Sequence, residues 1–111
     1  MKQKEIWLVN LDPTIGAEIK KIRPCVILNS NLVGKLPLKI VAPITDFKPK
    51  YELVPWMVTL RPNQENNLNK ISTIDLFQVR SISELRLIKK IGVISDIELK
   101  KCKEALYLVF E

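Results

Sequence analysis

The spacing of hydrophobic positions changes along the chain and predicts several strands followed by one helix. Runs of β-branched and aliphatic residues are separated by segments with proline, asparagine, serine or glycine, the usual boundaries of strands. The first run, 5–11, is apolar almost throughout, which is typical of a strand buried on both faces. Pro43 predicts an edge or bulge where the third strand ends, because proline has no N–H for the ladder. The predicted strands cover residues 5–11, 24–28, 38–44, 55–60 and 71–79.

After these runs the pattern becomes partly helical. Ser83 is expected to cap a short helix over 83–88, and 90–94 is predicted to be a brief strand. Ser95 and Glu98 match the S-x-x-E capping box, in which each side chain accepts a backbone N–H at a helix start. Apolar residues at intervals of three and four then predict the buried face of a C-terminal helix. These residues are Leu99, Cys102, Ala105, Leu106 and Val109.

Short antiparallel strands with one C-terminal helix predict a mainly β protein. We expect the sheet to curl into a small barrel whose open end or face is covered by the helix. With 111 residues, 47% of them hydrophobic, the chain is too apolar to be disordered and is predicted to form one domain, 1–111. No apolar run approaches the ~18 residues of a membrane span, and no signal-peptide pattern is recognised. We therefore expect a cytoplasmic protein.

The absence of histidine narrows the chemistry more than any other count. It excludes histidine-containing triads and nearly every zinc site, so we expect no metal and no cofactor. Cys25 and Cys102 lie in apolar contexts without a CxxC pair, which indicates buried small side chains in a reducing compartment. The net charge of +6 fits an RNA partner or an acidic protein partner and does not distinguish between them.

Several short motifs, taken in order, are specific enough to compare with a known family. The chain resembles the MazF/PemK family, the toxin half of type II toxin–antitoxin pairs, over almost its whole length outside 46–69. The opening strand and its D-P-x-x-G-x-E loop are similar over 6–18, and the Arg-Pro-apolar strand over 22–28. The remaining matches are Pro43-Ile44-Thr45, the Q-x-R-[ST]-I element at 78–82, Arg86-Leu87 and Lys90-Ile91-Gly92.

The resemblance implies a fold, an activity and partners. Members of this family are dimeric SH3-like barrels, and CcdB shares the fold. They cut single-stranded mRNA at short sequences without metal, leaving a 2′,3′-cyclic phosphate and a 5′-hydroxyl. A cognate antitoxin with an acidic, partly disordered C-terminal arm blocks them. By resemblance we expect the same of this chain: an endoribonuclease, a homodimer and an antitoxin-binding protein.

The residues that match the family motifs also suit this chemistry. Cleavage through the RNA 2′-hydroxyl needs a proton acceptor and donors around the phosphorane, but no protein nucleophile. We expect Arg23 to stabilise the phosphorane charge, since its guanidinium is a poor proton donor. Thr45 offers a hydroxyl from a strand end, and Glu18 a carboxylate in the preceding loop. Catalytic roles are therefore predicted for Arg23 and Thr45, with Glu18 in support.

A second set of residues is predicted to bind RNA. Lys20 and Lys21 make the loop basic, and the carboxamide of Gln78 suits a base edge of splayed single-stranded RNA. Arg80 and Ser81 follow from the Q-x-R-[ST]-I element. Each of these residues also has a simpler explanation as a solvated side chain, a strand-end hydroxyl or a surface ion pair.

The departures from the family pattern leave alternatives open. The plasmid PemK branch has an acidic residue at Phe77, a histidine at Ala17 and an arginine at Asp75, so its acid–base assignment does not transfer. Phe77 either stacks on a base or packs in a core or interface. Two other functions share the fold: a gyrase poison resembling CcdB, and a silent homologue that binds RNA or antitoxin. The cut sequence cannot be predicted from these residues.

Overall fold

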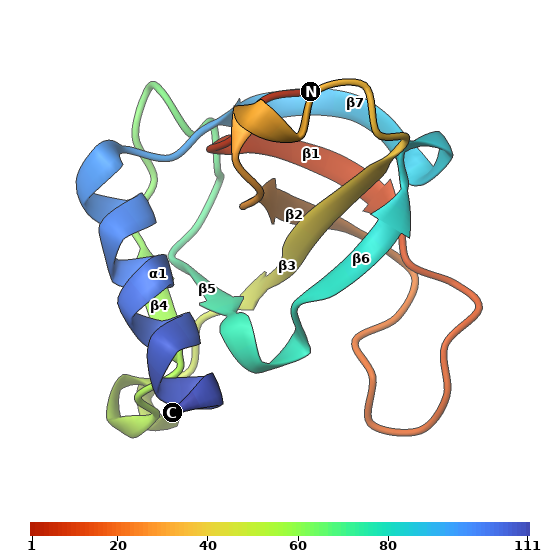
Figure 1. Ribbon diagram of the computed structural model, residues 1–111. Coiled ribbons are helices and arrows are strands. Elements are labelled where there is room, and N and C mark those ends of the chain that lie inside the picture. The colour runs from red at the N-terminus through yellow and green to blue at the C-terminus, as the bar shows by residue number, and fades with distance from the viewer.

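Seven antiparallel strands and one C-terminal helix build the structure, a computed structural model that describes residues 1–111 (Figure 1). The strands pair in the order β4-β5-β3-β2-β1-β7, and β6 also pairs with β3. No ladder joins β7 to β4 or β6, so the sheet curls into a barrel-like shape without closing. The predicted mainly β class is confirmed. The elements are β1 Glu5–Asn10, β2 Ile22–Ile27, β3 Leu38–Asp46, β4 Met57–Leu60, β5 Ser72–Asp75, β6 Arg80–Ser83, β7 Leu87–Val93 and α1 Asp96–Phe110.

The strands bury side chains on both faces. In β1, Ile6 and Val9 have no exposed surface and belong to different hydrophobic clusters, as predicted for the first strand. The larger cluster includes Cys102 and lies between the sheet and α1, and the smaller one includes Cys25. Burial raises the pKa of both thiols to about 12, so the two cysteines behave as the predicted buried side chains.

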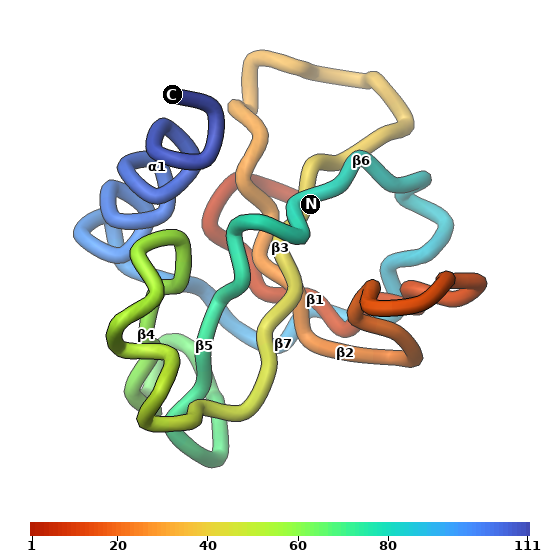
Figure 2. The backbone as a smooth tube through the Cα atoms, turned by 90° about the horizontal axis from the view of Figure 1, so that it is seen from below, coloured from red at the N-terminus to blue at the C-terminus, as the bar shows by residue number.

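Helix α1 starts at the predicted capping box. The Glu98 N–H donates to Ser95 Oγ at 3.1 Å, and the Ser95 N–H donates to Glu98 Oε1 at 2.8 Å. The helix packs against β4 and against the turn that follows β5. In both backbone views it lies on the opposite side of the molecule from the loop 11–21 (Figures 1 and 2). No helix of the chain combines the length and the apolar character that a membrane crossing requires.

The segment 71–79, predicted as one strand, is interrupted where it passes Pro43 of the neighbouring strand β3. β5 pairs with residues 44–46 of β3 and β6 pairs with residues 38–41, while Leu76–Gln78 leave the ladder as a 3₁₀ turn. The Phe47 N–H donates to the Ile71 oxygen on the β5 side of β3. Because backbone N–H and C=O groups point to alternate edges of a strand, those of residues 45 and 43 face the same side, so the position of Pro43 also faces the β5 side. Pro43 has no N–H to donate, and the ladder breaks there.

Two further predictions differ from the structure: the end of the third strand and the short helix over 83–88. β3 does not end at Ile44 but continues to Asp46, because residues 44–46 pair with β5. Pro43 keeps its place in the strand by pairing with Cys25 of β2 on its other edge. The predicted helix over 83–88 is one 3₁₀ turn at Glu84–Arg86, although Ser83 caps it by accepting the Leu85 N–H at 3.2 Å. β7 therefore begins at residue 87 rather than 90, since Leu87 already pairs with Val9 of β1.

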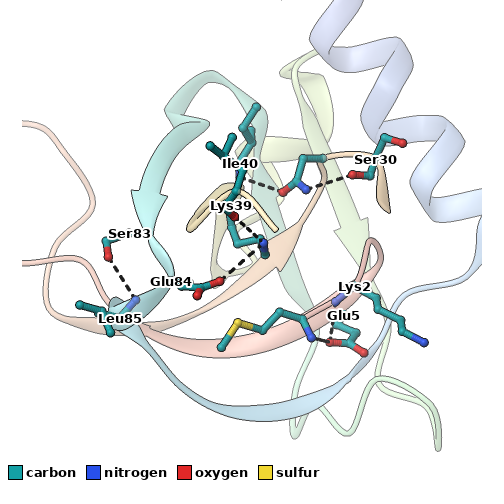
Figure 3. A network of polar contacts seen from close by, with 11 residues as sticks. Lys2, Glu5, Ser30, Lys39, Ile40, Ser83, Glu84 and Leu85 are labelled. Carbon is teal, nitrogen blue, oxygen red and sulfur yellow. Dashed lines mark hydrogen bonds and ion pairs between the residues drawn. The ribbon is translucent and has the colours of Figure 1, made fainter. Parts of the chain in front are cut away.

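Two charged side chains are buried in the polar network of Figure 3. Lys39 Nζ lies 3.7 Å from Glu84 Oε2 and donates to the Leu36 backbone oxygen at 3.3 Å. Glu5 accepts the Lys2 N–H at 2.9 Å. Glu5 also accepts from Trp7 Nε1 at 2.9 Å. Burial of Glu5 disfavours its charge, but these donors and the Lys90 ammonium outweigh burial and lower its pKa to about 2. These contacts fasten the chain start and the β6–β7 turn to the sheet.

Candidate active site

The loop 11–21 between β1 and β2 is fastened at its base by hydrogen bonds. The Leu11 N–H donates to the Lys21 oxygen at 2.9 Å, and the Lys21 N–H donates to Asp12 Oδ1 at 3.0 Å. From outside the loop, Arg80 Nη1 donates to the Leu11 oxygen at 3.2 Å, and Arg86 Nη1 donates to the Asp12 oxygen. Four side-chain and backbone contacts thus close the base of a mostly exposed loop.

Gln78 holds the far part of this loop with both ends of its carboxamide. Gln78 Oε1 accepts the Ile19 N–H at 2.6 Å, and Gln78 Nε2 donates to the Ala17 oxygen at 3.3 Å. Glu18 lies between these two residues, and its Oε1 accepts the Ile15 N–H at 2.5 Å. In this conformation the carboxamide of Gln78 is occupied by the loop, so it is not free to read a base as the sequence predicted.

Between this loop and the 76–78 turn lies a cavity of about 460 Å³. Phe77 stands at its wall with 63% of its surface exposed, and its ring packs on Trp56 at 5.6 Å between centroids. Phe77 is therefore not a core residue in this chain, and stacking on a base remains open to it. The cavity is lined by Leu11, Ala17, Glu18, Ile19, Pro43, Phe77, Gln78, Val79 and Arg80.

Arg23 of β2 and Thr45 of β3 do not themselves line this cavity. The β2–β3 ladder ends at the pair Cys25–Pro43, and its register extended by two residues would bring Arg23 opposite Thr45. Residues directly opposite in adjacent strands share a face. Pro43 lines the cavity, and Thr45 follows it on the same side of β3. Arg23 and Thr45 are both half-buried, which leaves part of each side chain accessible.

Two arginine side chains, Arg80 and Arg23, lie near the buried thiol of Cys25. The Arg80 and Arg23 guanidinium groups lie close enough to Cys25 to oppose the rise of its thiol pKa that burial causes. Arg23 donates through Nε to the Lys20 oxygen at 3.1 Å, which joins the guanidinium to the loop and leaves its two Nη atoms unengaged. Such a pair of Nη donors suits phosphate oxygens.

A buried carboxylate shapes the turn that carries Phe77 and Gln78. Asp75 Oδ1 accepts the Phe77 N–H at 3.1 Å and caps the turn. Burial raises the Asp75 pKa above its ordinary value, although the backbone N–H groups of Phe77 and Gln78 act in the opposite direction. The Asp75 cap thus fixes the turn that carries Gln78, while burial works against the charged form of its carboxylate.

The structure gathers most of the predicted site residues, but not all of them. Glu18, Gln78 and Arg80 line the cavity, and Lys20 and Lys21 lie exposed on the same loop. Ser81 does not join them: it pairs with the outward-facing Ile40, whereas its neighbours Arg80 and Ile82 point to the opposite face.

Three residues that shape the site were named in the sequence motifs without a predicted role. Asp12 and Arg86 close the base of the loop, and Asp75 caps the turn below Gln78. Asp12 begins the D-P-x-x-G-x-E motif but received no role of its own, although an Asp side chain at a turn commonly accepts a backbone N–H. The contact of Arg86 joins residues 74 positions apart, and nothing local in the sequence signals it.

Comparison with known proteins identifies what this arrangement resembles. Residues 2–110 match the family described as PemK-like, MazF-like toxin of type II toxin–antitoxin system. Endoribonuclease MazF9 of Mycobacterium tuberculosis is 32% identical, with 97% of this chain and 94% of that protein covered. Endoribonuclease MazF of Staphylococcus saprophyticus is 33% identical, covering 96% and 88%. The solved structure of Mycobacterium tuberculosis toxin MazF-mt6 has a TM-score of 0.77 at 25% identity, covering 96% and 95%.

Proposed function

Because this chain belongs to the PemK-like, MazF-like family of type II toxin–antitoxin toxins, we propose that it is an endoribonuclease toxin that cleaves single-stranded mRNA in the cytoplasm. The observation that supports the site assignment is the β2–β3 register: extended by two residues beyond the pair Cys25–Pro43, it would bring Arg23 opposite Thr45, two residues after the cavity-lining Pro43. The activity belongs to one toxin domain, residues 1–111.

The reaction uses the RNA's own 2′-hydroxyl as nucleophile. Glu18 takes the proton from this hydroxyl through its unengaged Oε2, and the 2′-oxygen attacks the adjacent phosphorus. Arg23 donates its free Nη groups to the phosphorane, and Thr45 donates its hydroxyl to a second oxygen. The bond to the 5′-oxygen breaks and solvent protonates that oxygen, which leaves a 2′,3′-cyclic phosphate and a 5′-hydroxyl without a metal.

Binding of the RNA strand is assigned to the basic rim around the cavity. Lys20 and Lys21 are exposed on the loop and neutralise backbone phosphates, and Phe77 offers an exposed ring for base stacking. Arg80 and Gln78 support the loop that forms the cavity wall. Ser81 lies away from the cavity and contributes least.

The partners follow the family. We infer that the chain forms a homodimer and binds a cognate antitoxin, whose acidic C-terminal arm meets the net charge of +6. The same positive field attracts RNA, so antitoxin and RNA compete for one charged surface. Light scattering measures the dimer, and cleavage assays with added antitoxin measure the competition.

The test is cleavage of a long natural RNA in EDTA, read by primer extension. The wild-type chain should cut at short defined sequences and leave a 5′-hydroxyl. Arg23→Ala and Thr45→Ala should each lower cleavage by at least about 100-fold while the fold persists. Arg61→Ala removes an exposed arginine away from the cavity and serves as the matched control. Intact RNA after exhaustive incubation with folded, antitoxin-free protein would overturn the proposal.

The two alternatives give different results in the same experiments. A silent homologue retains RNA in a gel shift but yields no product. A gyrase poison leaves RNA intact and traps cleaved DNA on gyrase. The relatives named above are endoribonucleases, and neither alternative has an observation of its own in this structure.

A further inference from the structure

Thr73 is buried without a hydrogen-bond partner. Its residue has no exposed surface, and Thr73 Oγ1 is the one buried side-chain nitrogen or oxygen atom in the chain that makes no hydrogen bond. Buried hydroxyl groups are nearly always paired, because an unpaired one loses its contacts with water and gains none in return. Valine has the same shape and avoids this penalty, so the hydroxyl of Thr73 calls for a reason.

The sheet places this hydroxyl between two other threonines. β5 lies between β3 and β4 (Figure 2). Thr73 pairs directly with Thr45 of β3 and with Thr59 of β4. Side chains of directly opposite residues lie on the same face, with Cβ atoms roughly 4.5–5.5 Å apart, within reach of a Thr–Thr hydrogen bond. Since Thr73 is fully buried, its hydroxyl contacts RNA only through a neighbour.

We propose that Thr73 is a positioning residue for Thr45, an inference that rests on the proposed role of Thr45 at the scissile phosphate. When RNA is bound, the Thr73 hydroxyl donates its proton to Thr45 Oγ1. Thr45 is then held in one rotamer and directs its own proton to the phosphate oxygen. Such a chain of two hydroxyls also polarises the outer O–H, which strengthens its hydrogen bond to the developing negative charge.

Thr59 is the less suitable partner. It lies on β4, beside a separate cavity that α1 lines with Lys101 and Glu104, away from the loop that carries Glu18. Thr45 follows the cavity-lining Pro43 on the same face. Thr59 therefore provides a matched control: it flanks the same hydroxyl at the same register but leads to no proposed reacting group.

The experiment compares Thr73→Val, Thr73→Ser and Thr59→Val with the wild-type chain in single-turnover cleavage of a short RNA carrying the site found by primer extension. Thr73→Val should lower the cleavage rate constant about tenfold. Its Kd for the uncleavable 2′-deoxy analogue should stay within about twofold, and its Tm should be unchanged or higher because the unpaired hydroxyl is gone. Thr73→Ser should recover most of the rate, and Thr59→Val should cut like the wild type.

A double-mutant cycle separates this inference from the proposed function. In a Thr45→Val background, Thr73→Val should have no further effect, because its target hydroxyl is absent. Should Thr73→Val fold poorly, Thr73→Ala takes its place in the cycle. Wild-type cleavage by Thr73→Val, or an equal loss in both backgrounds, overturns the inference and leaves the proposed function intact. If Thr45→Val itself cuts normally, the proposed role of Thr45 fails first.

Discussion

Two long polar loops of this protein are fastened in opposite ways. The loop 11–21 is mostly exposed, and side chains from other elements hold it: Gln78 beyond its tip, Arg80 and Arg86 at its base. The loop that follows β4 folds around a side chain of its own. Asn66 in that loop is fully buried and donates to the Arg61 oxygen at 2.8 Å.

The second loop is also pressed against the sheet. Asn66 Oδ1 accepts the N–H groups of Asn63 and Leu68, each at 3.0 Å, and the Val93 N–H donates to the Glu65 oxygen at 2.9 Å. Gly92 of β7 lies so close that an added Cβ would stand 2.4 Å from the Glu65 oxygen. In the first loop, an added Cβ at Gly16 would meet nothing within 4 Å.

The difference indicates which loop can change with a ligand. Releasing the 61–68 loop would expose a buried amide and several backbone groups at once, so it moves only when the sheet unfolds. Releasing the 11–21 loop breaks a few contacts that water can replace. We therefore expect the loop that carries Glu18 to be the adjustable wall of the cavity, and the other loop to stay in place as part of the scaffold.

The largest expected effect tests the scaffold loop. Gly92→Ala forces its Cβ against backbone atoms of Glu65 and Asn66, and should lower the free energy of unfolding by roughly 2–4 kcal/mol. Gly16→Ala is the control: it strains a residue with φ of 60° but meets no neighbour, and should cost roughly 1 kcal/mol. Urea unfolding measures both. Equal losses for the two variants would contradict the contrast between the loops.

A second pair of substitutions compares the two fastening side chains. Asn66→Ala leaves several buried groups unpaired and should lower the free energy of unfolding by roughly 3 kcal/mol. Gln78→Ala should cost less than about 1 kcal/mol, because the groups it releases reach water.

Local measurements on the 11–21 loop should show a clear effect of Gln78→Ala, although its effect on global stability is small. Gln78→Ala should speed hydrogen exchange at the Ile19 amide and trypsin cleavage after Lys20 and Lys21, because the loop loses its outer hydrogen bonds. Gln78→Glu keeps the acceptor for the Ile19 N–H and should show a smaller increase. Unchanged exchange and proteolysis in Gln78→Ala would mean that Gln78 does not hold the loop.

The smallest effect concerns the cap below Gln78. Burial raises the pKa of Asp75 in the folded chain, so the unfolded chain binds fewer protons and stability falls as pH rises through the window between the two values. Asp75→Asn keeps an oxygen for the Phe77 N–H without burying a charge, and should raise neutral-pH stability by roughly 1 kcal/mol or less. Urea unfolding as a function of pH should show that this part of the slope is lost. A variant less stable than the wild type at neutral pH would show that the carboxylate charge supports the turn.

Some of the fold and site could be predicted because the signals are local. The first strand, the capping box of Ser95 and Glu98, and the buried face of α1 each lie in one short segment, and all three are observed. The prediction of a short helix over 83–88 was wrong. The spacing of apolar residues there also fits a three-residue 3₁₀ turn followed by the start of a strand, which is what the structure has. There the pairing of Leu87 with Val9 decided the outcome.

The site itself shows where local reasoning stops. Gln78 was assigned to a base edge because a carboxamide offers a donor and an acceptor, but the fold presents the Ala17 oxygen and the Ile19 N–H to those atoms first. Ser81 shares a motif with Arg80, yet the alternation of β6 sends the two side chains to opposite faces. Motif order does not encode which face or which competing partner a side chain meets.

From residue order and composition alone come the mainly β class, the C-terminal helix and the toxin family, because period, capping and motif spacing act over a few residues. The sequence also determined which side chains can carry the chemistry, because the absence of histidine is a property of the composition and holds whatever the fold. Only the tertiary structure decided that Pro43 breaks the β5 ladder, that the displaced turn fastens the 11–21 loop, and that Thr73 faces Thr45. Those outcomes depend on pairing between distant strands, where one missing N–H or one register step determines what each side chain meets.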